Sequence, residues 1–380
     1  MTSQIRRSPS AAQERPRATL SYGDEFGPYI ITGFAGCGAT SYVYKARRRD
    51  RFEPVAIKVL HPHLVADSTR RLRFYREARI MMRMQHPNVV RFEEIIEEGE
   101  TLAFVMEYVD GVTLQKWRKS HQGAIDEVTL ACVFVDVLRG VTAAHREGVI
   151  HRDLKPGNIL IEEQDGRSVA KIIDFGVARF VDEPVSDAEK NKIIGTAAYV
   201  SPEEVGKPEE VCQASDLYSI GVMLYEAACG RRPFDGLEVR ELLQAHVRRN
   251  PRRPTQHNPG LSTSLEEVIL RTLDKRPDER FASAPEMIGA LEWALHAPQK
   301  SETSTAVPDG AVNQEQLETL QWSRPAEEKS PDDAPGPSFG GFFKNCLRAA
   351  LVLMTTTGAE GGTDERHYLN RGSNPVVPFR

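Results

Sequence analysis

Residues 151–158 read His-Arg-Asp-Leu-Lys-Pro-Gly-Asn, and residues 174–176 read Asp-Phe-Gly. The first run carries a candidate base, Asp153, and a lysine that can bind phosphate. Together the two runs supply an amide oxygen at Asn158 and a carboxylate at Asp174 as donors for a magnesium ion. Phosphoryl transfer requires such groups, because the attacking hydroxyl must be oriented and the charge on the phosphate must be neutralised. Both motifs in this order and spacing argue against a chance match.

Upstream, a glycine-rich stretch and a lysine occupy positions that suit a nucleotide. Residues 36–43 read Gly-Cys-Gly-Ala-Thr-Ser-Tyr-Val between two expected strands. Such a turn lets backbone N–H groups approach phosphate oxygens without interference from a Cβ. Residues 55–58 read Val-Ala-Ile-Lys, and a lysine in an apolar strand needs a partner when it is desolvated. The candidate partner of Lys58 is Glu77, on an expected helix, in preference to the nearby acids Glu94, Glu97 and Glu98.

The order of expected elements divides this part of the chain in two. Runs rich in β-branched and aromatic residues predict strands at about 29–36, 41–48 and 54–60, and two further strands are expected near 89–97 and 102–108. Apolar residues on one side predict a helix at about 67–84. Apolar residues at helical spacing predict buried helices at 127–147 and 214–229, with further helices in 264–296. Strands plus one helix, followed mostly by helices, suit two lobes with a cleft between them.

With these motifs the sequence resembles the eukaryotic-type protein kinases, and most of all the serine/threonine kinases of bacteria. The resemblance covers about residues 26–296 and implies a kinase domain at 26–297 with a bilobal α+β fold. The small N-lobe, about 26–109, would hold an antiparallel sheet plus one helix. The larger C-lobe, about 110–297, would be mostly helical. The Asp-Leu-Lys-Pro run resembles serine/threonine kinases rather than tyrosine kinases, so the expected substrates are proteins with Ser or Thr acceptors.

The resemblance also implies roles for the catalytic groups. Asp153 would orient the substrate hydroxyl or accept its proton, and Lys155 would contact the γ-phosphate of ATP. Asn158 and Asp174 would hold Mg²⁺, which prefers oxygen ligands and keeps several waters. Lys58 would bind the α- and β-phosphates and pair with Glu77.

A second set of residues would bind the nucleotide, again by resemblance. Ser41 stands where the family pattern has its third glycine, which leaves open how the turn closes over the phosphates. Residues 106–109 would be the hinge, whose backbone groups bond adenine. The expected nucleotide-binding residues are Gly36, Gly38, Ser41, Val43, Ala56, Lys58, Met106, Glu107, Val109 and Leu160.

Other positions have structural duties in the family. His151 would pack with Phe175 and Met81 rather than act as a base. Residues 195–203 read Gly-Thr-Ala-Ala-Tyr-Val-Ser-Pro-Glu and resemble the end of an activation segment. Within and beyond that run, the resemblance implies that Thr196 lies near Asp153, that Glu203 pairs with Arg280, and that Asp216 and Gly221 support the catalytic loop from a buried helix.

Regulation is less fully specified. An arginine directly before the catalytic aspartate, here Arg152, usually accompanies control by phosphate on the activation segment. Ser186 is the single hydroxyl residue between Asp174 and Gly195. We therefore expect either weak dependence on phosphorylation of this segment or use of Ser186. Cys37, in the glycine-rich turn, is a weaker candidate for a redox switch.

Composition excludes several classes of protein. The chain has 380 residues, of which 40% are hydrophobic and 27% charged, as in ordinary soluble domains. A net charge of -5 gives no support for nucleic-acid binding, which usually leaves a basic domain. The five cysteines are scattered and lack Cys-x-x-Cys spacing, which argues against disulfides or a zinc site and suits a reducing cytosol. Residues 1–20 lack the apolar core of a signal peptide, so we expect a cytoplasmic protein.

The ends of the chain differ from the kinase-like part. Residues 1–25 are polar and are expected to be disordered, and 298–338 read as a disordered acidic linker. Residues 339–380 begin apolar and end polar. Their first part, 339–358, is open to three interpretations: a membrane span, an amphipathic segment that binds an interface or a partner, or a weakly ordered tail. A span needs roughly 20 mostly apolar residues; membrane contact is not favoured because the stretch is interrupted by Lys344, Asn345 and Arg348.

Two other classes of function compete with an active protein kinase. A pseudokinase would be a binding or scaffold module on the same fold, but the chain has all of the expected catalytic residues. A small-molecule kinase of related fold would usually lack the peptide-docking run at 195–203.

Overall fold

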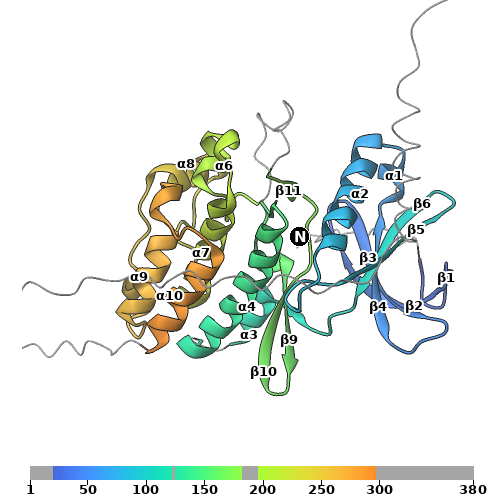
Figure 1. Ribbon diagram of the computed structural model, residues 1–380, viewed down its shortest axis with the longest axis horizontal. Helices are drawn as coiled ribbons and strands as arrows, with labels where there is room; N and C mark the ends of the chain where they lie inside the picture. The colour runs from blue at the N-terminus through green and yellow to red at the C-terminus, as the bar shows by residue number, and fades with distance from the viewer. Residues whose placement is uncertain (1–19, 122–124, 182–195, 297–380) are drawn as a thin grey trace, which may run out of the picture. The chain divides into compact units, whose positions relative to one another are not determined.

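A six-stranded antiparallel sheet forms most of the N-terminal lobe (Figure 1). The computed structural model describes residues 20–121, 125–181 and 196–296 of the chain. The strand order is β1-β2-β3-β4-β6-β5. Strands β1 to β4 are therefore neighbours in chain order, and β6 lies between β4 and β5. The strands are β1 (Glu25–Phe26), β2 (Tyr29–Cys37), β3 (Ser41–Arg48), β4 (Pro54–Leu60), β5 (Phe92–Glu98) and β6 (Thr101–Glu107). The five expected strands are present, and the short β1 is an addition.

Helix α2 (Ser68–Arg83) packs beside this sheet. Asp67 caps its first turn, since its side chain accepts hydrogen bonds from the backbone N–H groups of Thr69 and Arg70. The buried face includes Phe74, Glu77 and Met81. A one-turn helix, α1 (Pro62–Val65), precedes α2 and is absent from the sequence expectation of a single helix.

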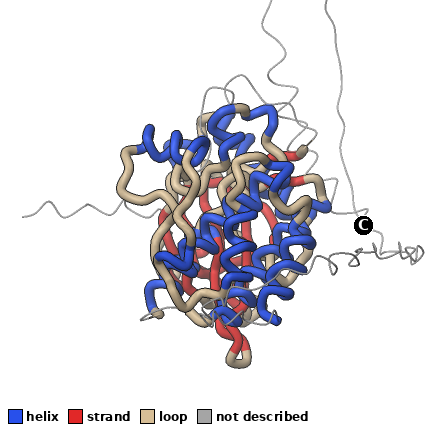
Figure 2. Tube along the Cα trace, turned by 90° about the vertical axis from the view of Figure 1, so that its left-hand side faces the viewer, coloured by secondary structure: helices blue, strands red, loops and turns tan. Residues whose placement is uncertain are grey.

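The C-terminal lobe begins with short strands and then becomes helical. Strands β7 (Val112–Thr113), β9 (Ile159–Gln164) and β10 (Arg167–Ile172) form one small sheet, and β8 (Val149–Ile150) pairs with β11 (Arg179–Phe180). The helices lie side by side (Figure 1, Figure 2). They are α3 (Leu114–Ser120), α4 (Glu127–Arg146), α6 (Pro202–Gly206), α7 (Gln213–Cys229), α8 (Val239–Arg248), α9 (Thr263–Thr272) and α10 (Ala284–His296).

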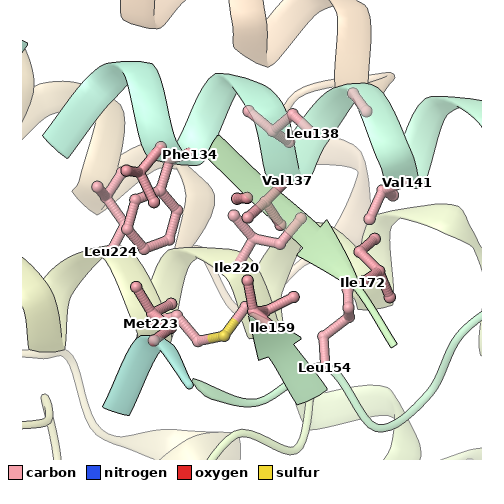
Figure 3. Close-up of a cluster of buried hydrophobic side chains, with 14 of the residues drawn as sticks. Phe134, Val137, Leu138, Val141, Leu154, Ile159, Ile172, Ile220, Met223 and Leu224 are labelled. Atoms are coloured by element: carbon pink, nitrogen blue, oxygen red, sulfur yellow. The ribbon is translucent and has the colours of Figure 1, made fainter. Parts of the chain in front are cut away.

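The core of this lobe is built around α4 and α7. Phe134 and Val137 of α4 face Leu224 and Ile220 of α7, and Val141 of α4 faces Ile172 of β10 (Figure 3). In the described part of the chain, α4 alone has the length and apolar composition of a membrane span, but 67% of its apolar window is buried inside the lobe. Helix α4 is therefore a core helix, and the apolar stretch at 339–358 lies outside the described residues.

One segment after α2 is attached to the C-terminal lobe rather than to its own sheet. The backbone N–H of Val90 donates to the Ile172 carbonyl, and the N–H of Ile172 donates to the Asn88 carbonyl, each at 2.9 Å. The Asn88 side chain also donates to the Ala170 carbonyl at 2.9 Å. Gly140 of α4 permits this approach, because a Cβ there would lie 2.7 Å from the Asn88 carbonyl oxygen.

Candidate active site

Lys58 joins three segments of the chain. It lies in the middle of β4, and its Nζ is 2.5 Å from Oε1 of Glu77 on α2 and 3.1 Å from Oδ1 of Asp174. Lys58 is 8% exposed and Glu77 is 4% exposed, so this pairing is largely withdrawn from water. The expected partner of Lys58 is thus confirmed, and Asp174 is brought to the same ammonium group.

The charges in this cluster do not balance, because one ammonium faces two carboxylates. Burial alone would lower the pKa of Lys58, but Asp174 and Glu77 raise it above its ordinary value. Burial also disfavours ionised Asp174, yet the charge of Lys58 together with hydrogen bonds to Asp174 outweighs burial and holds the pKa of Asp174 well below its usual range. The excess of negative charge affects Glu77 most, because burial and repulsion from Asp174 raise the pKa of Glu77 to about 7.

The segment 151–158, here called the catalytic loop, gathers polar groups around Asp153. Lys155 Nζ donates to Oδ2 of Asp153 at 2.5 Å, and Thr196 Oγ1 donates to Oδ1 at 3.0 Å. The side-chain nitrogen of Asn158 donates to the Asp153 carbonyl at 2.9 Å. The Asp153 side chain is only 12% exposed. The expected approach of Thr196 to Asp153 is confirmed, and the carboxylate is held in one orientation by a cation and a hydroxyl.

A buried aspartate on α7 fixes the backbone of the catalytic loop. Asp216 accepts hydrogen bonds from the N–H groups of His151 (2.9 Å) and Arg152 (3.0 Å), and from Nε2 of His145 (2.8 Å). Arg152 has a φ of 67°, a left-handed conformation that is costly for a residue with a Cβ. Burial disfavours the Asp216 charge, but the bonds from His145 and the loop keep the pKa of Asp216 below its usual value. The predicted support by Asp216 is confirmed.

His151 packs inward as expected. Its ring lies 4.8 Å from the ring of Phe175, centroid to centroid, and burial lowers the pKa of His151. A neutral, buried imidazole stacked on an aromatic ring is a packing residue rather than a general base.

The glycine-rich turn, residues 36–43, closes the hairpin of β2 and β3. Gly36 pairs with Val43, and Cys37 pairs with Tyr42. The N–H of Gly38 donates to the Ser41 carbonyl at 2.8 Å, which closes the tip. Ser41 is only 3% exposed, so its side chain points into the protein.

The residues expected around adenine share one apolar cluster. Ala56 of β4 pairs with Met106 of β6, and both are buried. Val109 is buried in the same cluster, and Val43 and Leu160 are partly buried against it. The side chain of Glu107 instead forms an ion pair with Lys171 of β10, so only its backbone remains for a nucleotide.

One further contact expected from the sequence is present, and a close helix contact at Gly221 was not expected. Arg280, fully buried, donates from both terminal nitrogens to Glu203, at 2.8 and 2.9 Å. Gly221 of α7 allows a close approach by α9, because a Cβ there would lie 2.7 Å from Cγ2 of Thr272. Ser186 lies outside the described residues, as does the rest of 182–195.

Sequence reasoning did not single out His145 or Glu204. His145 reads as an ordinary polar residue near the end of an apolar helix, and only the fold brings it to Asp216. Glu204 follows Glu203 and is equally buried; its carboxylate accepts from the N–H and Oγ of Ser201, and burial raises the pKa of Glu204 to about 8. The Ser-x-x-Glu spacing of a capping box was a usable signal for Glu204.

Comparison with known proteins agrees with this geometry. Residues 29–293 match the protein kinase domain family. The chain is 32% identical over 348 residues to the serine/threonine-protein kinase PkaA of Streptomyces coelicolor, covering 88% of this chain and 61% of PkaA. It is 37% identical over 265 residues to the serine/threonine-protein kinase PknB of Mycobacterium tuberculosis, covering 68% of this chain and 41% of PknB. The chain thus spans only part of the length of these relatives.

A solved structure gives the same result for the fold. The kinase domain of Mycobacterium tuberculosis PknI is 25% identical, covers 72% of this chain and 99% of the solved chain, and superposes with a TM-score of 0.56. The expected bilobal α+β fold is therefore confirmed, and the chain belongs to the protein kinase domain family.

Proposed function

We propose that this chain is a serine/threonine protein kinase, which transfers the γ-phosphoryl group of ATP to Ser or Thr hydroxyls of proteins. The observation that carries the proposal is the junction at Lys58, where one ammonium contacts both Glu77 and Asp174. Those contacts bring α2 and the Asp-Phe-Gly motif to the strand that would bind the phosphates. The names of the relatives support the choice of Ser and Thr as acceptors.

The residues present fit a magnesium ion. The nitrogen of the Asn158 amide donates to Asp153, which leaves Oδ1 as a ligand. Asp174 is held ionised by Lys58, as a metal ligand must be. In the described residues no three His, Cys, Asp or Glu side chains gather as a metal site. Asn158 and Asp174 together suit Mg²⁺, which takes few protein ligands and completes its coordination shell with phosphate oxygens and waters. When bound, the ion would neutralise phosphate charge.

The remaining groups of the site would handle the acceptor. Asp153 would orient the hydroxyl and accept its proton, because its carboxylate is nearly buried and fixed by Lys155 and Thr196. Lys155 would then stabilise charge on the transferred phosphoryl group. Most of the rate would come from positioning and electrostatics. The segment that carries Thr196 would also dock the peptide around the acceptor.

Mass spectrometry tests the proposal directly. Purified protein would be incubated with Mg·ATP and a generic protein substrate, beside Asp153→Asn as the matched control. Phosphate on Ser or Thr in the wild type only is the expected outcome, and the map would show whether Ser186 or a tail residue such as Ser301 or Thr303 is an acceptor. Bound ATP with no phosphate on protein would favour the pseudokinase alternative instead.

The remaining parts of the chain are assigned as follows. We propose that the kinase domain spans 26–297, that segments of polar composition at 1–25 and 298–338 flank it in the sequence, and that the protein is cytoplasmic. Membrane contact, if present, would come from the apolar stretch at 339–358. Cell fractionation of the full chain and of a variant ending at 338 tests this: loss of membrane-bound protein on truncation would contradict a purely cytoplasmic location.

A further inference from the structure

His61, the first residue after β4, contacts the tip of the glycine-rich turn at two points. Its backbone N–H donates to the Thr40 carbonyl at 2.9 Å, which extends the pairing of β3 and β4 by one bond beyond Ser41 and Leu60. Its Nε2 lies 3.0 Å from the Gly38 carbonyl oxygen. A carbonyl only accepts, so Nε2 carries the hydrogen and donates it.

The imidazole is held rigidly in place. His61 is 6% exposed, and the ring of Tyr42 meets it edge-on at 4.2 Å between centroids. Helix α1 begins at the next residue, Pro62, which also restricts the backbone of His61. A donor with so little freedom fixes the orientation of the group that accepts from it.

The side chains on the two faces of β4 show from which side of the sheet His61 bonds the Gly38 carbonyl. Lys58 and Leu60 point to the face that packs on α2, where Glu77 lies, whereas Val59 joins Tyr42 in the cluster on the opposite face. Side chains alternate along a strand, so His61 lies on the face of Val59 and Tyr42, away from Lys58. The Gly38 carbonyl is therefore bonded from the outer face of the sheet.

The peptide unit that follows Gly38 is planar and trans, so its C=O and N–H point in opposite directions. Fixing the Gly38 carbonyl toward the outer face therefore aims the N–H of Ala39 toward the inner face, where Lys58 lies. We propose that His61 is a positioning residue of the nucleotide site, which presents the Ala39 N–H to the phosphates of ATP. It supplies rigidity at a turn that has Ser41 where the family pattern has a third glycine. This inference rests on the proposed nucleotide site.

Binding of two ligands separates this role from a general structural one. A non-hydrolysable ATP analogue with Mg²⁺ carries phosphates, whereas adenosine carries none, and both would be titrated calorimetrically into the same proteins. His61→Leu keeps an apolar side chain but loses the donor. This variant is expected to lower the affinity for the analogue about five-fold, which corresponds to the loss of one neutral hydrogen bond, and to leave the affinity for adenosine within two-fold. His296→Leu, which replaces an exposed histidine at the end of α10, is the matched control and should change the affinity for neither ligand.

Restoring the donor completes the test. His61→Gln places an N–H near the position of Nε2 and should recover most of the affinity for the analogue, whereas His61→Asn, with its shorter side chain, should not. That pair also serves if His61→Leu folds poorly. Equal weakening of both ligands by His61→Leu, or equal behaviour of the Gln and Asn variants, would overturn the inference. Failure of the wild type to bind the analogue would instead overturn the proposed function, and the inference with it.

Discussion

Replacing Glu203 by glutamine is expected to lower the free energy of unfolding by about 3–5 kcal/mol at pH 7. The side chain of Arg280 is 0% exposed and that of Glu203 is 3% exposed, so the variant would leave a buried guanidinium without its counter-charge. Arg280 also donates to the carbonyls of Asp274 and Ala214, each at 2.8 Å, and these bonds survive the change. We therefore expect a loss near the lower end of that range.

An exposed ion pair in the same region provides the control. Arg276 and Glu279 also form a salt bridge, but their side chains are 65% and 50% exposed. Because water screens such a pair, Glu279→Gln should cost less than about 1 kcal/mol. Urea unfolding followed by far-ultraviolet circular dichroism would compare the two variants with the wild type.

Acid should remove the difference between wild type and Glu203→Gln. Burial disfavours ionised Glu203, but the bonds and charge of Arg280 outweigh it and lower the pKa of Glu203. A carboxylate whose pKa is lowered by folding adds stability above its unfolded-state pKa of roughly 4.3, and loses that contribution as the pH falls through the folded value. The reasoning is refuted if both variants lose equal stability at pH 7, or if the deficit of Glu203→Gln persists in acid.

Three further changes have defined outcomes. Because burial raises the pKa of Glu204 to about 8, the free energy of unfolding of the wild type should fall as the pH rises from roughly 4.5 to 8. Glu204→Gln has no carboxyl group to ionise, so thermal unfolding at pH 8.5 should show it more stable than the wild type by up to about 4 kcal/mol. Gly140→Ala should cost about 1–3 kcal/mol in urea unfolding because its Cβ meets the Asn88 carbonyl, whereas Gly289→Ala, with open space around it, should be neutral or stabilising. Asp216→Asn should slow phosphoryl transfer about ten-fold or more in a peptide assay and leave nucleotide affinity within two-fold, because Asp216 bonds the catalytic loop and not Lys58. An equal loss of rate and of nucleotide affinity would contradict this prediction.

The sequence predicted the parts of the site whose chemistry is carried by motifs. Lys58 stands out because an ammonium in an apolar strand needs a partner, and Glu77 was found because it is a glutamate on the expected helix. The pairing of Glu203 with Arg280 came from the family resemblance alone. What could not be predicted is the sharing of Lys58 between Glu77 and Asp174, since that depends on distances between segments far apart in the chain.

Elements without a long apolar pattern were missed. Helix α8 was not predicted, although Val239, Leu242 and Leu243 stand at helical spacing, because the helix has only ten residues and its apolar pattern is correspondingly short. Helices α1, α3 and α6 are each too short for helical periodicity to be recognised. His61 belongs to no recognisable motif, and its contact with Gly38 could be found only from the fold, which brings the tip of the hairpin to its side chain.

The hydrogen bonds of Ile172 with the backbone of Asn88 and Val90 have a consequence for any rotation of the N-terminal lobe. In such a rotation the segment after α2 would be the pivot, because these bonds hold it to the C-terminal lobe. During a rotation about this pivot, displacement grows with distance from it, so the C-terminal end of α2 moves least and the capped end at Asp67 moves most. Glu77 lies between those ends, so such a rotation would draw its carboxylate away from Lys58 and leave that ammonium paired with Asp174 alone.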